Sequence, residues 1–192
     1  MAQSRGRVRI TQEILVPGLP PVIKVGNWQH NLALYGCADI AARLLSGGQR
    51  YRLSAMYIEF ANLDSPGDTI APPSFNRSGG LDYYLGLVSD DTKDYLRVPI
   101  FSYGITSEDA SLFPLGNIVQ FMAKTAGLVG INGKPFSSDY NSTIIGGAVV
   151  ATPEPENSAA DVVYARWYEE EEAQLLKEAN SQLCVTWELT LG

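Results

Sequence analysis

Hydrophobic and polar residues alternate most clearly near the end of the chain, between Gln182 and Leu191. Large apolar residues occupy every second position, and small or polar residues fill the positions between them. Successive side chains of a β-strand point to opposite faces of a sheet, so this period of two predicts a strand with one buried face. We expect that face to consist of Leu183, Val185, Trp187, Leu189 and Leu191. Such a strand belongs to the core, and its removal should unfold the domain.

Further strands are predicted where apolar and β-branched segments are separated by turn residues. The segment Tyr51–Phe60 alternates at its start and becomes apolar on both faces, which is typical of a strand buried on both sides. Residues 62–82 are polar and rich in Gly and Pro, and a loop of about 20 residues inside a compact domain is usually functional or ordered by a partner. The other segments with strand character are 94–104, 112–124, 143–152 and 161–167.

Two segments have the spacing of helices. In residues 31–46, Asn31 is a candidate amino-terminal cap, apolar residues recur every three or four positions, and Gly47-Gly48 provides a stop. In residues 169–179 a run of Glu precedes Leu175, Leu176 and Lys177, an order that suits the helix dipole. We therefore expect one early and one late helix.

Together these elements predict a mainly β fold: a β-sandwich of jelly-roll type with one early and one late α-helix. Residues 1–29 are expected to form an extended N-terminal arm, because Pro17, Pro20 and Pro21 lack the amide hydrogen that an interior strand needs. Residues 30–192 are expected to form a single β-sandwich domain, a size that one domain commonly reaches.

Charge narrows the classes of partner. The 192 residues include 14 Lys and Arg against 21 Asp and Glu, a formal net charge of −7. Nucleic-acid binding needs clustered cations, so this balance predicts no nucleic-acid partner. Arg5, Arg7 and Arg9 are the local exception, and we interpret them either as the solvated face of an edge strand or as an anchor on an acidic partner. The amino end lacks the apolar segment of a signal peptide and no apolar run reaches ~18 residues, so no membrane partner is expected.

The sequence contains few residues that could form a metal site or a catalytic site. His30 is the only histidine, and Cys37 and Cys184 are the only cysteines, which we expect to be buried thiols rather than a disulfide. A metal site built on several imidazoles is impossible with one histidine. We therefore expect no catalytic residue, no metal and no cofactor.

Carboxylates leave one catalytic alternative open. Glu59 lies in a predicted strand, where a buried acid would need a partner such as an arginine. A glycosidase-like pair could combine it with Asp82, Asp94 or Glu188. Two acidic turns, at 64–68 and 90–91, could hold calcium, although turn acids usually cap backbone amides.

Several aromatic residues lie near loops, and they could stack against sugars or anchor a protein interface. The alternative is that they are ordinary core residues. They are Tyr83, Tyr84, Phe101, Tyr103, Phe113 and Tyr140.

Two stretches resemble small virion proteins of tailed bacteriophages. One is Leu44-Leu45-Ser46-Gly47-Gly48 followed by Ala55-Met56-Tyr57-Ile58-Glu59-Phe60-Ala61-Asn62; the other is Ser181-Gln182-Leu183-Cys184-Val185-Thr186-Trp187-Glu188-Leu189-Thr190-Leu191. The chain is similar to capsid cement (decoration) proteins of sandwich fold, and nearly as much to tail or head-fibre components. This resemblance implies a non-enzymatic homo-oligomer that binds other virion subunits. It transfers no functional residue, because none of these positions matches a defined site motif.

We therefore expect a capsid cement protein of the virion, assembled in the host cytoplasm as a trimer, that stabilises a phage head by binding between subunits of the major capsid protein. The alternative is a tail, baseplate or fibre protein that binds glycan on the host surface. Contacts are expected in the amino-terminal arm and in the loop at 62–82. The interface residues predicted there are Arg5, Arg7, Arg9, Ile10, Ile14, Pro72, Pro73 and Phe75.

Overall fold

The fold is mainly β, as the sequence predicts. The computed structural model describes residues 5–33, 40–43, 45–47, 51–61, 93–128, 142–153, 161–168 and 175–191. These residues contain ten strands. They are β1 (Arg5–Ile14), β2 (Val22–Val25), β3 (Gln29–Ala33), β4 (Arg52–Ala61), β5 (Lys93–Thr106), β6 (Ile118–Lys124), β7 (Ser142–Thr152), β8 (Val162–Tyr168), β9 (Leu175–Lys177) and β10 (Ser181–Thr190).

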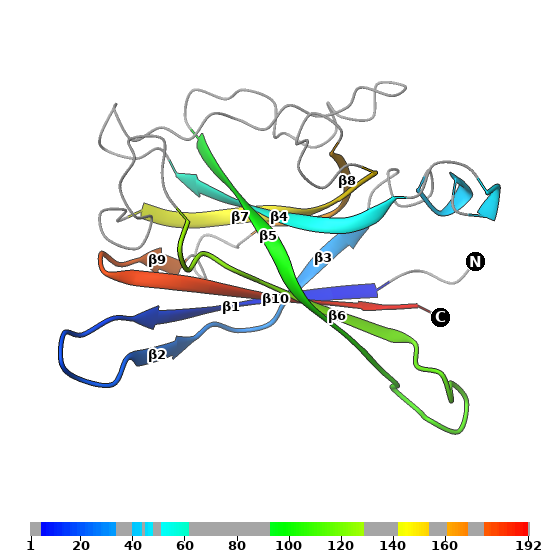
Figure 1. The fold of residues 1–192 in the computed structure, drawn as a ribbon, viewed down its shortest axis with the longest axis horizontal. Coiled ribbons are helices and arrows are strands. Elements are labelled where there is room, and N and C mark those ends of the chain that lie inside the picture. Colours follow the sequence, from blue (N-terminus) through cyan, green and yellow to red (C-terminus); the bar gives the residue numbers. More distant parts are fainter. Residues whose placement is uncertain are drawn as a thin grey trace.

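The strand pairs of this part of the chain are all antiparallel and join into one curled sheet (Figure 1). The order is β10-β6-β5-β4-β7-β8-β3-β1-β2, and β9 pairs with β7 outside this path. The curl also brings β1 beside β10. These two strands pair from Arg5 opposite Thr190 to Ile14 opposite Ser181. The first and last strands of the chain are therefore neighbours, and β10 has a partner on each edge.

The alternation near the carboxyl end produces the strand that it predicts. Leu183, Val185, Trp187 and Leu189 are all buried in β10. The alternation also predicts Leu191 on the same face, and this prediction is wrong: the residue follows the end of β10 and is 47% exposed.

The segment expected to form an extended arm, residues 1–29, contributes two strands to the sheet. Val8 and Ile10 of β1 are buried in the core, and Gln12 is buried as well. On its second edge β1 pairs with β3 near Gly6 and with β2 near its end. Thus β1 lies inside the sheet, and the prolines of this segment lie between β1 and β2, where no ladder bond is lost.

Of the two predicted helices, the early one is found only in part and the late one is not shown. The early one fails at its start, since Gln29–Ala33 form β3 and pair with β1 and β8; helical turns occur only at residues 40–43 and 45 of the described chain. The late one fails at its end, since Leu175–Lys177 form β9 against β7, and residues 169–174 lie outside the described part of the chain. In both places pairing with distant strands overrides local helix propensity.

The main core lies inside the curl, and seven strands contribute to it: β1, β4, β5, β6, β7, β8 and β10. Trp167 and Trp187 meet edge to face with ring centroids 5.4 Å apart, and Phe121 lies 6.5 Å from Trp187 in a stacked arrangement. A second buried set covers the opposite face of β4, β7 and β8, with Ala55, Tyr57, Ala148, Val150 and Val163. Strand β4 is therefore buried on both faces, as its sequence predicts.

Candidate protein interface

Arg7 and Arg9, two of the three arginines predicted as interface residues, lie on the outer face of β1, opposite the buried Val8 and Ile10. Arg7 Nε donates a hydrogen bond to Glu188 Oε2 at 2.5 Å. The guanidinium carbons of Arg7 and Arg9 lie 4.3 and 4.5 Å from the ring centroid of Trp28. Both arginines therefore hold one indole by cation–π contacts, each contributing about 0.5–1 kcal/mol at an exposed site. This face carries a local positive cluster on an acidic chain.

Ile10 and Ile14, which are predicted for the same interface, do not lie on this face. Ile10 packs in the core, so its side chain is not offered to a partner, and Ile14 is half-buried at the end of β1. Arg5 pairs with Thr190 through its backbone, and its side chain is not among those described. Pro72, Pro73 and Phe75 lie outside the described residues.

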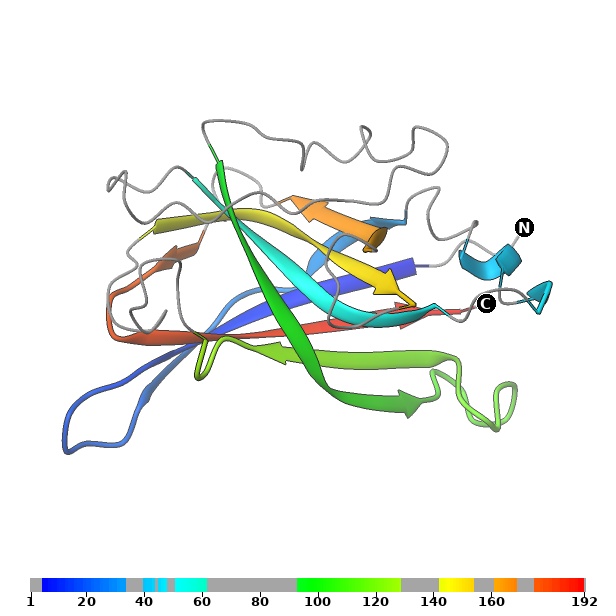
Figure 2. The ribbon, with the colours of Figure 1, turned by 45° about the horizontal axis from the view of Figure 1, so that its top comes forward.

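The β1–β2 hairpin projects away from the curled sheet (Figure 2). All four residues of β2 are exposed, so both faces of the hairpin are open to solvent there. Its base is fixed, because Leu15 N donates to Asn180 O at 2.7 Å, Gly26 N donates to Ile10 O at 2.8 Å and Lys24 forms an ion pair with Glu178. The apolar side chains exposed on it are Leu15, Leu19, Val22, Ile23 and Val25.

A second exposed apolar surface follows the last half of β5, which we call the β5 stripe: Phe101, Tyr103 and Ile105. These side chains are 60%, 58% and 69% exposed and alternate along one face of the strand. Up to Pro99, β5 pairs with β4; from Ile100 to Thr106 it pairs with β6. Within the described ranges no strand pairs with the second edge of β5 from Ile100 to Thr106. The Tyr103 hydroxyl donates to Leu53 O at 2.7 Å and fixes the middle of the stripe.

The sequence predicts that the strand after β5 begins at Leu112, but turns occupy residues 107–117 and β6 begins at Ile118. Asp109 organises these turns: its Oδ1 accepts from Ser111 N at 2.8 Å and from Ser111 Oγ at 2.6 Å. Gly116 completes them at φ 88°, and a Cβ there would stand 2.8 Å from Thr106 O. Leu112 and Leu115 remain exposed in this ordered connection.

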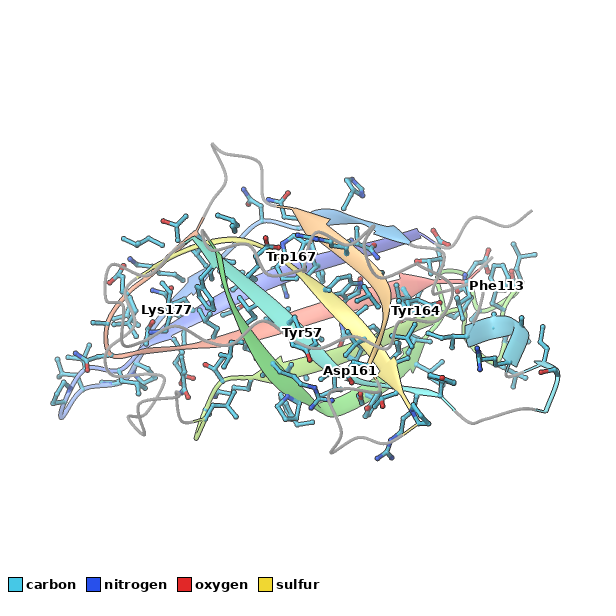
Figure 3. All side chains as sticks on the ribbon, turned by 90° about the horizontal axis from the view of Figure 1, so that it is seen from above. Tyr57, Phe113, Asp161, Tyr164, Trp167 and Lys177 are labelled. Atoms are coloured by element: carbon cyan, nitrogen blue, oxygen red, sulfur yellow. The ribbon has the colours of Figure 1, made fainter. Side chains whose placement is uncertain are left out.

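Charged groups are also buried on the outer face of β4 and its neighbours. Both oxygens of Asp161 accept from Arg97, Nε at 2.8 Å and Nη2 at 3.1 Å, and Oδ2 also accepts from the Tyr57 hydroxyl at 2.7 Å. Tyr57 and Asp161 lie side by side at the centre of this face (Figure 3). Burial, together with the Asp161 charge, raises the pKa of Tyr57 well above its usual value. This triad joins β4, β5 and the start of β8.

Glu59 has the buried arginine partner that its position in a strand predicts. It forms an ion pair with Arg166 of β8, and both side chains are almost fully buried. Glu188, one of its proposed catalytic partners, instead accepts from Arg7 and from Gln120 Nε2. The side chains of Asp82 and Asp94, the other two, are not described. Glu59 therefore joins β4 to β8 across the intervening β7.

The other residues singled out for chemistry are spread over the fold. His30 is exposed on β3, opposite Arg7. Cys184 is a free, half-buried thiol whose pKa is raised by burial, and Cys37 is outside the described part, as are the acidic turns at 64–68 and 90–91. Among the residues that are described, no three His, Cys, Asp or Glu side chains gather as metal ligands would, and no helix is long and apolar enough to cross a membrane.

In comparisons with known proteins, no family model, no curated protein and no solved structure matches the chain.

The sequence predicts part of these surface features: Phe101 and Tyr103, named among the aromatic residues that could contact a sugar or a partner, are exposed, whereas Ile23 and Ile105 are not singled out by it. The β-branched run Val22-Ile23 and the alternation of Phe101, Tyr103 and Ile105 both look like buried strand. The available signal was the setting of the first run, between Pro20-Pro21 and Gly26, which is typical of a short hairpin arm.

Proposed function

We propose that this chain is a non-enzymatic structural subunit of a tailed-phage virion, a capsid cement protein that stabilises the head by binding between subunits of the major capsid protein. The resemblance of its sequence to small virion proteins supports the virion assignment. The projecting β1–β2 hairpin supports binding to another protein, and this is the observation on which the proposal rests.

The hairpin suits insertion between two subunits. It exposes apolar side chains on both faces, with Leu19, Ile23 and Val25 all more than half exposed. Burying such surface contributes roughly 25 cal/mol per Å² of apolar area. A contiguous exposed apolar patch on a soluble protein usually marks an interaction site. Because its base is held by β10 and by the ion pair between Lys24 and Glu178, the hairpin is presented in a fixed position.

The arginines fit the rim of such a contact. Arg7 and Arg9 lie on the same strand as the base of the hairpin, and Trp28 holds both side chains in place. Arginine is enriched at protein interfaces, and held guanidinium groups suit acidic partner surfaces. The proposed interface also includes four residues that the sequence alone predicts there: Arg5, Pro72, Pro73 and Phe75.

A non-enzymatic role is supported by how the buried acids are used. Asp161 is saturated by Arg97 and Tyr57, and Glu59 is paired with Arg166. A general acid or base needs access to a substrate, whereas these carboxylates join strands.

We also propose that the curled sheet is a β-sandwich. Strand β5 changes partner from β4 to β6 with an irregularity after Ile100, and β3 pairs with β1 by its first residues and with β8 by its last. Strands that switch partners in this way form the corners of sandwiches whose two layers cross. The jelly-roll subtype remains a proposal from the sequence.

The decisive experiment uses phage heads assembled without this chain. Adding the purified protein should raise the temperature at which the heads release DNA, and heads whose stability is unchanged by it would contradict the proposal. The double variant I23E/V25E should keep the fold, because both side chains are exposed, but lose head binding. The matched control is L176E, an equally exposed apolar residue on β9, which should bind as the unmodified protein does.

The alternative is a tail, baseplate or fibre protein that binds host glycan, and the exposed rings of Phe101 and Tyr103 favour it, since aromatic rings stack against sugars. Locating the chain in intact particles separates the two functions: many copies over the head surface support cement, and a few copies at the tail support the alternative. A glycan-array signal that Tyr103→Ala abolishes would favour the second function.

A further inference from the structure

We propose that the β5 stripe is a self-association surface, on which a second copy of this chain docks antiparallel about a two-fold axis that passes near Tyr103. This deepens the proposed homo-oligomer by naming its contact and its symmetry. It does not depend on the capsid contact, which uses the β1–β2 hairpin, so failure of either experiment leaves the other proposal testable.

The first argument is the order of residues around Tyr103. In an antiparallel arrangement centred there, Phe101 faces Ile105 of the second copy, and Ile105 faces its Phe101. Ser102 and Gly104, both small, flank the axis on the other face of the strand. A two-fold interface needs this self-complementarity, because residue i meets residue j and residue j meets residue i.

The second argument is charge. Each copy carries a net charge of −7, so two copies repel one another over most of their surface. From Val98 to Ser107 the chain has no charged residue, and the stripe lies within this neutral stretch. The stretch itself therefore adds no repulsion between charged side chains, and no ion pair among the described residues involves it.

The third argument is the free edge of β5. The backbone groups on the second edge of Ile100–Thr106 have no partner strand in the described part of the chain. Natural edge strands are commonly protected by a charged side chain or kept short. Strand β2 has both protections, with four residues and Lys24 paired to Glu178, whereas this part of β5 has neither. Within the described ranges this edge of β5 is therefore open, so no strand of the same copy stands in the way of a second copy at the stripe.

The exposed area sets the strength of the contact. At the observed exposures, the three side chains of the stripe offer roughly 350 Å² per copy. Leu112 and Leu115 at the tip of the same hairpin add to it. Over both copies the stripe alone offers roughly 700 Å², below the about 1,200 Å² at the lower end of specific interfaces, so we expect a weak dimer that forms with rising concentration. A two-fold contact gives a dimer in place of the trimer expected from the sequence.

Sedimentation equilibrium of the full chain tests this inference. The expected result is a monomer–dimer equilibrium that tightens with added salt, since salt screens the repulsion between the acidic copies. A monomer at every concentration, or a trimer, would overturn it. Phe101→Glu and Ile105→Lys, introduced separately, should each weaken dimerisation by at least about tenfold, because each places a charge against an apolar side chain.

The register is tested by mixing these two variants. The carboxylate introduced at position 101 of one copy would face the ammonium group introduced at position 105 of the other. The mixture should therefore form a mixed dimer at least about tenfold tighter than either variant alone. No gain on mixing would overturn the antiparallel register.

The control for both experiments is I23E, a change of similar size and charge on the exposed β2. This variant should dimerise as the unmodified chain does, because β2 lies outside the proposed contact. Loss of the dimer there would overturn the proposal by assigning self-association to the β1–β2 hairpin. The fold of each variant is verified by circular dichroism.

Discussion

Gly147 of β7 lies directly against the indole of Trp167 on β8: a Cβ added at Gly147 would stand 2.0 Å from Trp167 Cζ3 and 2.2 Å from the Tyr57 carbonyl oxygen. Trp167 is held by its edge-to-face contact with Trp187, and the carbonyl oxygen belongs to the backbone of β4. Neither atom can move without shifting a strand. The missing side chain at position 147 is what allows β4, β7 and β8 to approach one another.

We therefore predict that Gly147→Ala lowers the free energy of unfolding by about 3 kcal/mol, the upper range for overpacking in a core. Gly104→Ala is the matched control, because no heavy atom lies within 4 Å of the Cβ position there; its effect should stay within about 0.5 kcal/mol. Urea unfolding of the two variants measures the difference. Equal stabilities would show that the sheet adapts freely at Gly147.

The buried pair of Glu59 and Arg166 gives a second prediction. Glu59→Leu and Arg166→Met should each lower the free energy of unfolding by about 3–5 kcal/mol, because each removes one partner of this buried ion pair. The double variant should lose less than the sum of the two single variants, since the ion pair is lost only once. A double-mutant cycle in urea measures this coupling.

The exposed pair of Lys24 and Glu178 is the control for that cycle. Both side chains are 40–49% exposed, so Lys24→Ala should cost less than about 1 kcal/mol. If Glu59→Leu proves as mild as Lys24→Ala, the buried pair does not hold β4 to β8.

The Tyr57 hydroxyl predicts a dependence of stability on alkaline pH. Burial and the Asp161 charge keep the phenol neutral in the folded state, so its pKa there is raised. In the unfolded chain the same phenol ionises near pH 10. Above that pH the unfolded state binds fewer protons than the folded state, and the stability due to Tyr57 falls by about 1.4 kcal/mol per pH unit.

Tyr57→Phe isolates this contribution from the other tyrosines. At pH 8 the variant should be less stable by about 1.5–3 kcal/mol, because it lacks a hydrogen bond to a charged carboxylate. The gap between the variant and the unmodified protein should then narrow from pH 10 upward. Unfolding curves in denaturant at several pH values measure it, and two parallel pH profiles would exclude a neutral buried phenol.

A strand could be predicted from the sequence wherever the pattern of apolar and polar residues reflects which of its faces are buried. Strands β4, β7, β8 and β10 all lie close to the segments that the alternation marks, since one or both of their faces are packed against the core. Helical spacing in the neighbouring residues instead predicts helix for residues 31–33 and 175–177. Their strand state depends on β1, β8 and β7, which are distant in the sequence, and no local pattern contains that information.

The candidate interface could be predicted only in part, for the same reason. Arg7 and Arg9 alternate with the buried Val8 and Ile10, so their exposure follows from the period of the strand. The exposure of Ile23 and of the β5 stripe follows instead from where the curled sheet ends, which composition does not encode. Arg97 and Asp161 are 64 residues apart in the sequence, so their contact could not be predicted from a local pattern either.

A final prediction compares Leu189 with Leu191. The two residues have the same side chain and lie two positions apart in one alternating segment. Leu189 is 3% exposed within β10, whereas Leu191 is 47% exposed after its end. Leu189→Ala should therefore lower the free energy of unfolding by about 2–4 kcal/mol, and Leu191→Ala by less than about 1 kcal/mol. Urea unfolding compares the two variants. Equal losses would mean that the buried face of the last strand extends to Leu191, as the alternation alone predicts.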